Sequence, residues 1–314
     1  MSDPVDGVSP GPGARLAGIP APAGAAKAYG SRAFAGRPGA GRLQQTRGPL
    51  ALGACLLLLT VALAMGCSAK SSTDARPLCV AGSTSVQPFA EKLAEVYMQQ
   101  HPRARIEVQG GGSSAGILAA DHGAADLGAS SRELVAAEKH LTEIPIAYDG
   151  IAVIVHPANP LTNIRLEEIR QLFDGRVKDW KYLGLPPHAI DLITREEGSG
   201  TREAFEHLVM GQTEITPGAL VQDSNGSVRE IVAGDPYSVG YISAGLVDHR
   251  VKALTIDGVS PTPENIKTHN YQLVRRFLLV SRAAPAGRCK AFIDFILAPP
   301  GQRLLESEGL VGVH

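Results

Sequence analysis

The sequence predicts an α/β fold in which short apolar strands alternate with helices. Strands are expected at residues 77–81, 105–109 and 126–129, and each of them ends in a turn rich in glycine or serine. The first two turns lead directly into helical patterns, which cover residues 86–100 and 117–119. Alternation of this kind is typical of a parallel sheet, in which ligands bind outside the carboxyl ends of the strands.

The remaining elements continue this pattern along the chain. Residues 144–156 form a nearly uninterrupted apolar stretch, which predicts a strand long enough to serve two sheets in turn. Apolar spacing then predicts helices at 166–173, 203–210, 227–233, 288–297 and 301–308, and strands at 190–194, 220–222, 240–242 and 277–281.

Composition bounds the number of domains and the kind of partner. The chain has 314 residues, of which 44% are hydrophobic and 19% charged, and its formal net charge is −1. This length allows one large domain or two smaller domains with real cores. The balanced charge provides no strongly basic surface, so we expect no nucleic-acid partner.

The N-terminal segment predicts an exported protein. Residues 1–48 are rich in Gly, Ala and Pro and lack apolar periodicity, so they are interpreted as disordered or as a start codon assigned too early. Residues 49–66 contain an apolar run, Leu50 to Met65, that is short for a bilayer span and typical of a signal peptide. A membrane anchor is the alternative.

The end of that run resembles a bacterial lipoprotein box, Ala64-Met65-Gly66-Cys67, although Leu63 stands one place before the usual leucine. The resemblance implies cleavage before Cys67, lipid on its thiol and a polar tether over residues 67–76. We therefore expect a membrane-anchored lipoprotein in the periplasm or on the cell surface. Cys79 and Cys289 remain in the mature body, either as one disulfide or as two buried free thiols.

Three glycine- and serine-rich turns predict a site for an oxyanion. They are Gly82-Ser83-Thr84-Ser85, Gly112-Ser113-Ser114 and the segment from Arg195 to Thr201, with Ser131 as a weaker fourth contribution. Helix starts carry unpaired N–H groups and partial positive charge, hydroxyls add donors, and Arg195 adds a forked cation. The alternative is a set of unrelated capped turns.

Two enzyme motifs are also present in weak form. Gly112 to Gly116 fits the G-x-S-x-G pattern, which would make Ser114 the nucleophile of a serine hydrolase with His269 as candidate base. Gly110-x-Gly112-x-x-Ala115 fits a loose dinucleotide fingerprint, but no acidic residue stands clearly about twenty positions further on. No Walker loop is present, and we expect no cofactor, no metal and no enzymatic activity.

From about Leu78 onward, the chain resembles the substrate-binding proteins of phosphate ABC transporters, the PstS family. The motifs that carry the resemblance are Ala81 to Pro88, Val108 to Gly116, Gly128 to Arg132, Asp149 to Val153, Arg195 to Arg202, Asp223 to Val228, Gly240 to Ser243 and Ala291 to Leu297. It implies a two-lobed periplasmic-binding-protein fold of type II, with mixed sheets flanked by helices and two crossing hinge strands. Lobe 1 would comprise residues 77–149 and 245–314, and lobe 2 residues 150–244.

The resemblance also implies a function and a site. A monomer would bind inorganic phosphate in the cleft between the lobes and deliver it to ABC transporter permease subunits. The residues expected at the phosphate site are Ser83, Thr84, Ser85, Ser113, Ser131, Asp149, Arg195, Ser199, Gly200 and Thr201. The alternatives are a binding protein for another tetrahedral oxyanion, such as molybdate, tungstate or a phosphonate, and an envelope phosphate sensor.

One position departs from the family pattern. Better-known members have Asp where this chain has Ser131, and that Asp accepts the proton that phosphate carries. We expect Asp149 on the long strand to take this role, which would disfavour sulfate because sulfate has no proton to share. Arg132 has three interpretations, namely a second cation, a partner that orients the carboxylate, or a salt bridge at the surface or between the lobes.

Overall fold

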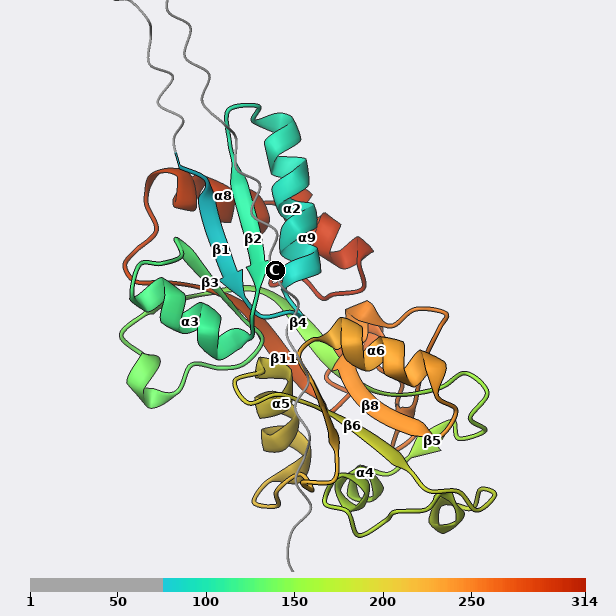
Figure 1. Ribbon diagram of the computed structural model, residues 1–314. Coiled ribbons are helices and arrows are strands. Elements are labelled where there is room, and N and C mark those ends of the chain that lie inside the picture. The colour runs from blue at the N-terminus through green and yellow to red at the C-terminus, as the bar shows by residue number, and fades with distance from the viewer. Residues whose placement is uncertain (1–75) are drawn as a thin grey trace, which may run out of the picture. The chain divides into compact units, whose positions relative to one another are not determined.

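The structure is a computed structural model of the chain, and it describes residues 76–314. The predictions for residues 1–75, which include the N-terminal extension, the signal peptide and the lipid site at Cys67, lie outside the described residues. Within residues 76–314, two large groups of buried apolar side chains mark two lobes. The two lobes share one mixed sheet (Figure 1). This two-lobed α/β arrangement confirms the predicted fold class.

The sheet runs without interruption through both lobes, in the order β2-β1-β3-β11-β4-β8-β6-β7. Lobe 1 contributes β1 (Leu78–Gly82), β2 (Ile106–Gly110) and β3 (Leu127–Ser130), which are parallel to one another. Lobe 2 contributes β6 (Asp191–Arg195), β7 (Leu220–Gln222) and β8 (Ser238–Ser243), which are also parallel. The carboxyl ends of these strands carry the turns that the sequence singled out.

Two antiparallel strands connect the lobes, as predicted. The long strand β4 (Thr142–Val155) pairs with β11 (Val274–Ser281) up to Gly150 and with β8 from Ile151 onward. One strand therefore serves both lobes in turn, and β11 brings the chain back beside it (Figure 1). The strand that pairs with β4 changes between Gly150 and Ile151, which marks the crossing from lobe 1 to lobe 2.

The return crossing lies later than the predicted boundary at residue 245. Leu254, Ile266 and Leu273 belong to the same buried cluster as Val153 and Trp180, so this part of the chain packs in lobe 2. Its elements are β9 (Lys252–Ala253), β10 (Thr255–Ile256), which pairs with β5 (Asn163–Ile164), and α7 (Pro263–Lys267). Such short elements leave little periodicity in the sequence, which is why the boundary was placed too early.

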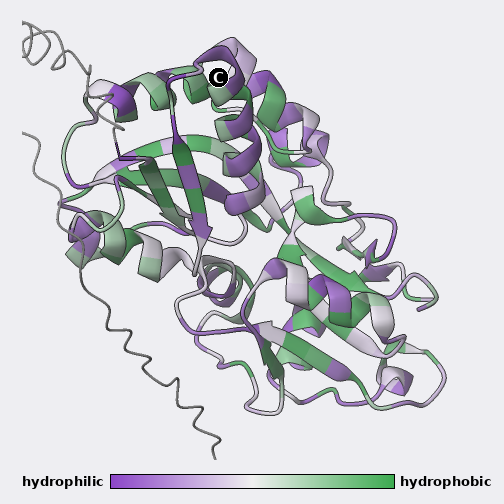
Figure 2. Ribbon diagram, turned by 45° about the horizontal axis from the view of Figure 1, so that its top comes forward, coloured by the Kyte–Doolittle hydropathy of each residue, from purple (hydrophilic) through white to green (hydrophobic). Residues whose placement is uncertain are grey.

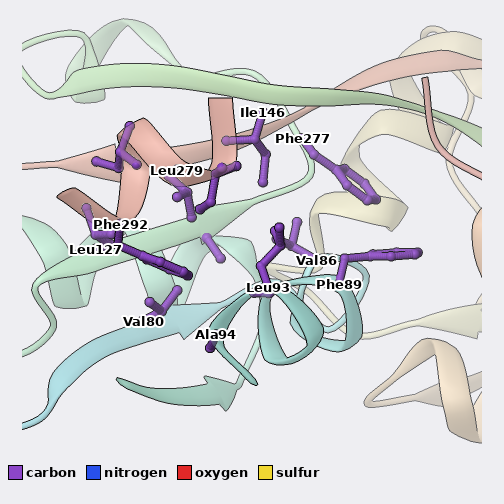
Figure 3. Close-up of a cluster of buried hydrophobic side chains, with 14 of the residues drawn as sticks. Val80, Val86, Phe89, Leu93, Ala94, Leu127, Ile146, Phe277, Leu279 and Phe292 are labelled. Carbon is purple, nitrogen blue, oxygen red and sulfur yellow. The ribbon is translucent and has the colours of Figure 1, made fainter. Parts of the chain in front are cut away.

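Lobe 1 is built around the apolar face of α2 (Gln87–Gln100). Figure 3 shows Phe89 and Leu93 of this helix, with Val86 at its N-cap, in one cluster with Ile146 of β4 and Phe277 of β11. Full burial of each such side chain contributes about 1.5–3 kcal/mol. The lobe is completed by α3 (Ser113–Asp121), η1 (Ala136–Glu138), α8 (Gly287–Leu297) and α9 (Pro299–Ser307).

Lobe 2 packs around Trp180, Phe205 and Tyr241, all of which are buried. Its helical elements are α4 (Leu166–Phe173), η2 (Trp180–Leu183), α5 (Gly200–Phe205), the π-helical turn η3 (Glu206–Met210), α6 (Asn225–Gly234) and η4 (Ala244–Leu246). In both lobes the strands are largely hydrophobic, whereas the helices mix polar and apolar positions (Figure 2). The helix predicted at residues 203–210 starts earlier, because Ser199 caps it by accepting a hydrogen bond from the Arg202 amide.

Cys79 and Cys289 are free and half-buried, so of the two alternatives the structure has two thiols rather than a disulfide. No helix within residues 76–314 is long and apolar enough to cross a membrane.

Candidate anion-binding site

The turns of lobe 1 bring their serines together at the carboxyl ends of β1, β2 and β3. The Ser83 hydroxyl donates to Ser131 Oγ at 2.9 Å, and the Ser131 amide donates to Ser113 Oγ at 3.1 Å. All three residues are buried. Gly82 makes this approach feasible, because a Cβ there would lie 2.3 Å from the carbonyl oxygen of Ala129.

Lobe 2 brings the second half of the predicted set against the first. Gly200 begins α5 and packs so closely on lobe 1 that a Cβ would lie 2.2 Å from Ser113 Oγ and 2.7 Å from Ser131 Oγ. Thr201 Oγ1 is 2.7 Å from Ser85 Oγ, a hydrogen bond that joins the lobes. The turns from the two lobes therefore meet at one place.

Arg195 lies at the end of β6 with only 1% of its surface exposed. Glu196 holds the guanidinium at two points, Nε to Oε2 at 2.9 Å and Nη2 to Oε1 at 2.8 Å. Arg195 Nη2 also donates across the lobes to Thr84 Oγ1 at 3.2 Å. Its Nη1 is buried without any hydrogen-bond partner in the described part of the chain. An unpaired buried donor on a charged group costs several kcal/mol, so it requires an acceptor.

Asp149 is buried on β4 and is linked to the Ser85 hydroxyl through Arg275. It stands opposite Arg275 in the β4–β11 ladder, and its Oδ2 accepts from Arg275 Nε at 2.9 Å. Its Oδ1 accepts from the Ser243 hydroxyl at 2.8 Å. Burial raises the pKa of the Asp149 carboxyl, and the Arg275 charge opposes that shift. Both carboxylate oxygens are thus engaged by residues other than the predicted hydroxyls.

The sequence did not single out two residues that the structure places in the cluster, Asn225 and Arg275. Asn225 Nδ2 donates to Ser85 Oγ at 2.9 Å and to Thr84 Oγ1 at 3.2 Å. Its Oδ1 accepts from the Ser243 amide at 3.1 Å, so one carboxamide bonds to both lobes. A local signal existed for Asn225, because it follows β7 in a further strand–turn–helix pattern.

The alternatives left open for Arg132 are narrowed to a salt bridge between the lobes. Its Nη1 lies 2.7 Å from Glu138 in lobe 1, and its Nε lies 2.6 Å from Glu203 in lobe 2. Ser114 belongs to the same cluster, because its hydroxyl donates to Glu203 at 3.2 Å and accepts from Arg132 at 2.9 Å. His269 is exposed in lobe 2, so the structure does not assemble the predicted nucleophile and base.

Two lobes that share crossing strands, with donors from both lobes around a guanidinium whose Nη1 has no partner within residues 76–314, define a solute-binding protein with an interlobe site for an anion. A family model described as a PBP superfamily domain matches residues 68–300. The phosphate-binding protein PstS of Bacillus subtilis is 32% identical over 244 residues, which are 75% of this chain and 80% of the relative. The chain therefore belongs to the PstS family, which confirms the resemblance seen in the sequence.

Solved structures agree with this assignment. A candidate phosphate ABC transporter substrate-binding protein from Clostridium perfringens, solved with bound phosphate, matches with a TM-score of 0.74 and 39% identity over 76% of this chain and 100% of that chain. An ABC-type phosphate transport receptor from Vibrio cholerae matches with a TM-score of 0.63 and 38% identity over 74% of this chain and 99% of that chain.

Proposed function

We propose that this protein binds inorganic phosphate between its lobes and delivers it to the permease of an ABC transporter. The observation that carries the proposal is the buried Nη1 of Arg195, which has no acceptor within residues 76–314. A forked guanidinium fixed by Glu196 matches the geometry of an oxyanion. The names of the Bacillus and Clostridium relatives support phosphate as that oxyanion.

The hydroxyls around Arg195 supply the remaining donors. They come from Ser83, Thr84, Ser85, Ser113, Ser131, Ser199 and Thr201, with the backbone of Gly200 beside them. Hydrogen bonds to a charged group contribute about 1.5–3 kcal/mol each, so several of them exceed the roughly 8 kcal/mol of micromolar affinity. Because the donors belong to both lobes, bound phosphate stabilises the closed form that a permease would recognise.

The proposed function is tested by calorimetry of the purified protein with phosphate, sulfate and molybdate. We expect one phosphate per chain and a dissociation constant in the micromolar range or below. Arg195→Ala should weaken phosphate binding by about 2–4 kcal/mol, because it removes a buried charged donor. The matched control is Arg276→Ala, whose half-buried side chain pairs with Glu133 and Glu143 instead.

Two outcomes would overturn phosphate binding as the function. One is no heat with phosphate, and the other is tighter binding of sulfate or molybdate, which would make the protein a receptor for another oxyanion. Transport is separated from sensing by growth of a deletion strain on limiting phosphate. Normal growth and normal phosphate uptake would contradict the transport assignment.

We also propose that the mature protein begins at Cys67 and carries lipid on that thiol. The sequence around Ala64 to Cys67 supports this proposal. Mass spectrometry of the N-terminal peptide should find diacylglyceryl-modified Cys67, and Cys67→Ser should release the protein from the membrane fraction. An unmodified N-terminal peptide that starts elsewhere would contradict it.

A further inference from the structure

We propose that Arg275 is a second cation of the phosphate site and that Asp149 acts as its positioning residue. The inference rests on the proposed function and adds to the site a residue that the turn motifs do not contain. It also assigns Asp149 a role different from the proton acceptor that the sequence led us to expect.

Arg275 reaches the place where the two lobes meet. Its side chain is 3% exposed, its Nη2 donates to Ser85 Oγ at 3.2 Å and its Nη1 to the Ser131 carbonyl at 3.4 Å. Ser85 Oγ is the same atom that bonds to Thr201 and Asn225 of lobe 2. Arg275 therefore contacts the lobe 1 turns at the hydroxyl through which lobe 2 closes.

The donors of Arg275 are not all used within the protein. A guanidinium has five N–H groups, of which one is on Nε and two are on each Nη. Nε and Nη2 face Asp149 at 2.9 and 2.8 Å, and Nη2 also donates to Ser85. Nη1 has only the 3.4 Å contact with Ser131, at the outer limit of a hydrogen bond. At least one Nη1 hydrogen is left for a ligand oxygen.

Asp149 fixes this guanidinium as Glu196 fixes that of Arg195. Arg275 and Asp149 stand opposite each other in the ladder of the crossing strands, and Ser243 holds the other carboxylate oxygen. The two forks contact neighbouring hydroxyls of one turn, Arg195 at Thr84 and Arg275 at Ser85. Arg195 and Arg275 are thus two prepositioned cations that contact adjacent residues. Two such cations suit the several oxygens of one tetrahedral anion.

This arrangement separates two roles for Asp149. A proton acceptor must give an oxygen to phosphate, which would discriminate phosphate from sulfate. A positioning residue acts through Arg275, and Arg275 donates to both anions alike. Asp149→Asn should therefore change the dissociation constants of phosphate and sulfate by the same factor, within about threefold. A phosphate preference that narrows by tenfold or more would overturn the positioning role.

The cation role is tested with the double variant Asp149→Asn/Arg275→Gln, which removes both charges of the pair and leaves none unpaired. Calorimetry should show phosphate binding weakened by at least about 30-fold, as expected for loss of a charge-assisted donor. Arg276→Gln on the same strand is the control and should bind like wild type. If the double variant binds phosphate with an affinity within threefold of wild type, the Asp149–Arg275 pair is purely structural and the inference is overturned.

Folding is monitored separately through the melting temperature without anion. If the double variant fails to fold, Arg275→Lys provides the test, because it keeps the charge and loses the fork. We expect Arg275→Lys to bind phosphate about tenfold more weakly and to show a smaller phosphate-induced rise in melting temperature than wild type; wild-type values of both would overturn the inference. Absence of phosphate binding by the wild-type protein would instead remove the proposed function itself.

Discussion

Gly200→Ala tests whether phosphate binding depends on the close contact of the two lobes. A methyl group at residue 200 would lie 2.2 Å from Ser113 Oγ and 2.7 Å from Ser131 Oγ, both in the opposite lobe. Ordinary contact begins at 3.4 Å, so the shorter approach must lengthen by about 1.2 Å. Both neighbours are short, buried side chains with little room to move. The lobes must therefore separate.

The cost follows from the interlobe hydrogen bonds that this separation stretches. Three of them join Ser85 to Thr201 at 2.7 Å, Arg195 to Thr84 at 3.2 Å, and the Ser114 amide to the Gly198 carbonyl at 3.1 Å. About 1 Å of separation takes all three beyond hydrogen-bonding distance, and each contributes about 0.5–1.5 kcal/mol. The sum, about 1.5–4.5 kcal/mol, corresponds to a roughly 10- to 1,000-fold weaker phosphate affinity.

Calorimetry with phosphate measures this loss, and small-angle X-ray scattering with and without phosphate measures closure. The control is Gly226→Ala, near the start of α6, where the nearest atom to an added Cβ is 3.6 Å away. Both variants should keep the wild-type melting temperature without anion or raise it slightly, because alanine favours helices. Wild-type affinity and full closure in Gly200→Ala would refute the reasoning.

Three further predictions concern the salt bridge between the lobes, stability at alkaline pH and the hydrophobic core. Glu203→Gln removes the interlobe partner of Arg132 and should weaken phosphate binding by no more than about fivefold, since the pair is partly solvated; calorimetry showing a loss above 30-fold would contradict this. Burial raises the pKa of Tyr241 to about 12. The folded state then binds more protons than the unfolded state between pH 10 and 12. The free energy of unfolding should therefore fall there by about 1.4 kcal/mol per pH unit more in wild type than in Tyr241→Phe. Urea titrations measure it, and parallel pH curves for the two proteins would contradict the prediction. Leu93→Ala in α2 should lower the free energy of unfolding by about 2–5 kcal/mol. Leu118 is 56% exposed, so Leu118→Ala should lower it by less than about 0.5 kcal/mol. Equal losses in urea unfolding would count against the assignment of the core.

The sequence predicted where these turns fall in the chain, because turns depend on local chemistry. Parallel strands place their carboxyl ends on one edge of a sheet, so the lobe 1 turns at Gly82 and Ser113 are expected near each other. Gly200 follows β6 of the other lobe, which runs opposite to β1, so its approach to these turns was expected from the family resemblance. The long strand up to Val155 was also predictable, since a nearly uninterrupted apolar stretch of this length is long enough to serve two sheets.

The remaining features depend on contacts between distant parts of the chain. Arg275 pairs with Asp149 across 126 positions, and no local pattern distinguishes it from its neighbour Arg276. The same holds for the lobe boundary, because Leu254 and Ile266 belong to lobe 2 through packing rather than periodicity. The assignment of Asp149 as proton acceptor stays a prediction, and comparing phosphate with sulfate binding in Asp149→Asn decides between it and the positioning role.

The position of β11 in the sheet has a consequence for the order in which the chain matures. Lobe 1 contains β11 between β3 and β4, yet β11 is the last strand in sequence, after all of lobe 2. During synthesis from the N-terminus, lobe 2 can fold first, because all of it precedes β11 in the sequence. Until β11 is made, one edge of β3 has unpaired backbone hydrogen-bonding groups. Such an edge is open to wrong pairing with another chain until Val274 to Ser281 arrive. A truncation near the C-terminus that removes β11 should therefore destabilise lobe 1, which contains the N-terminal strands, more than lobe 2.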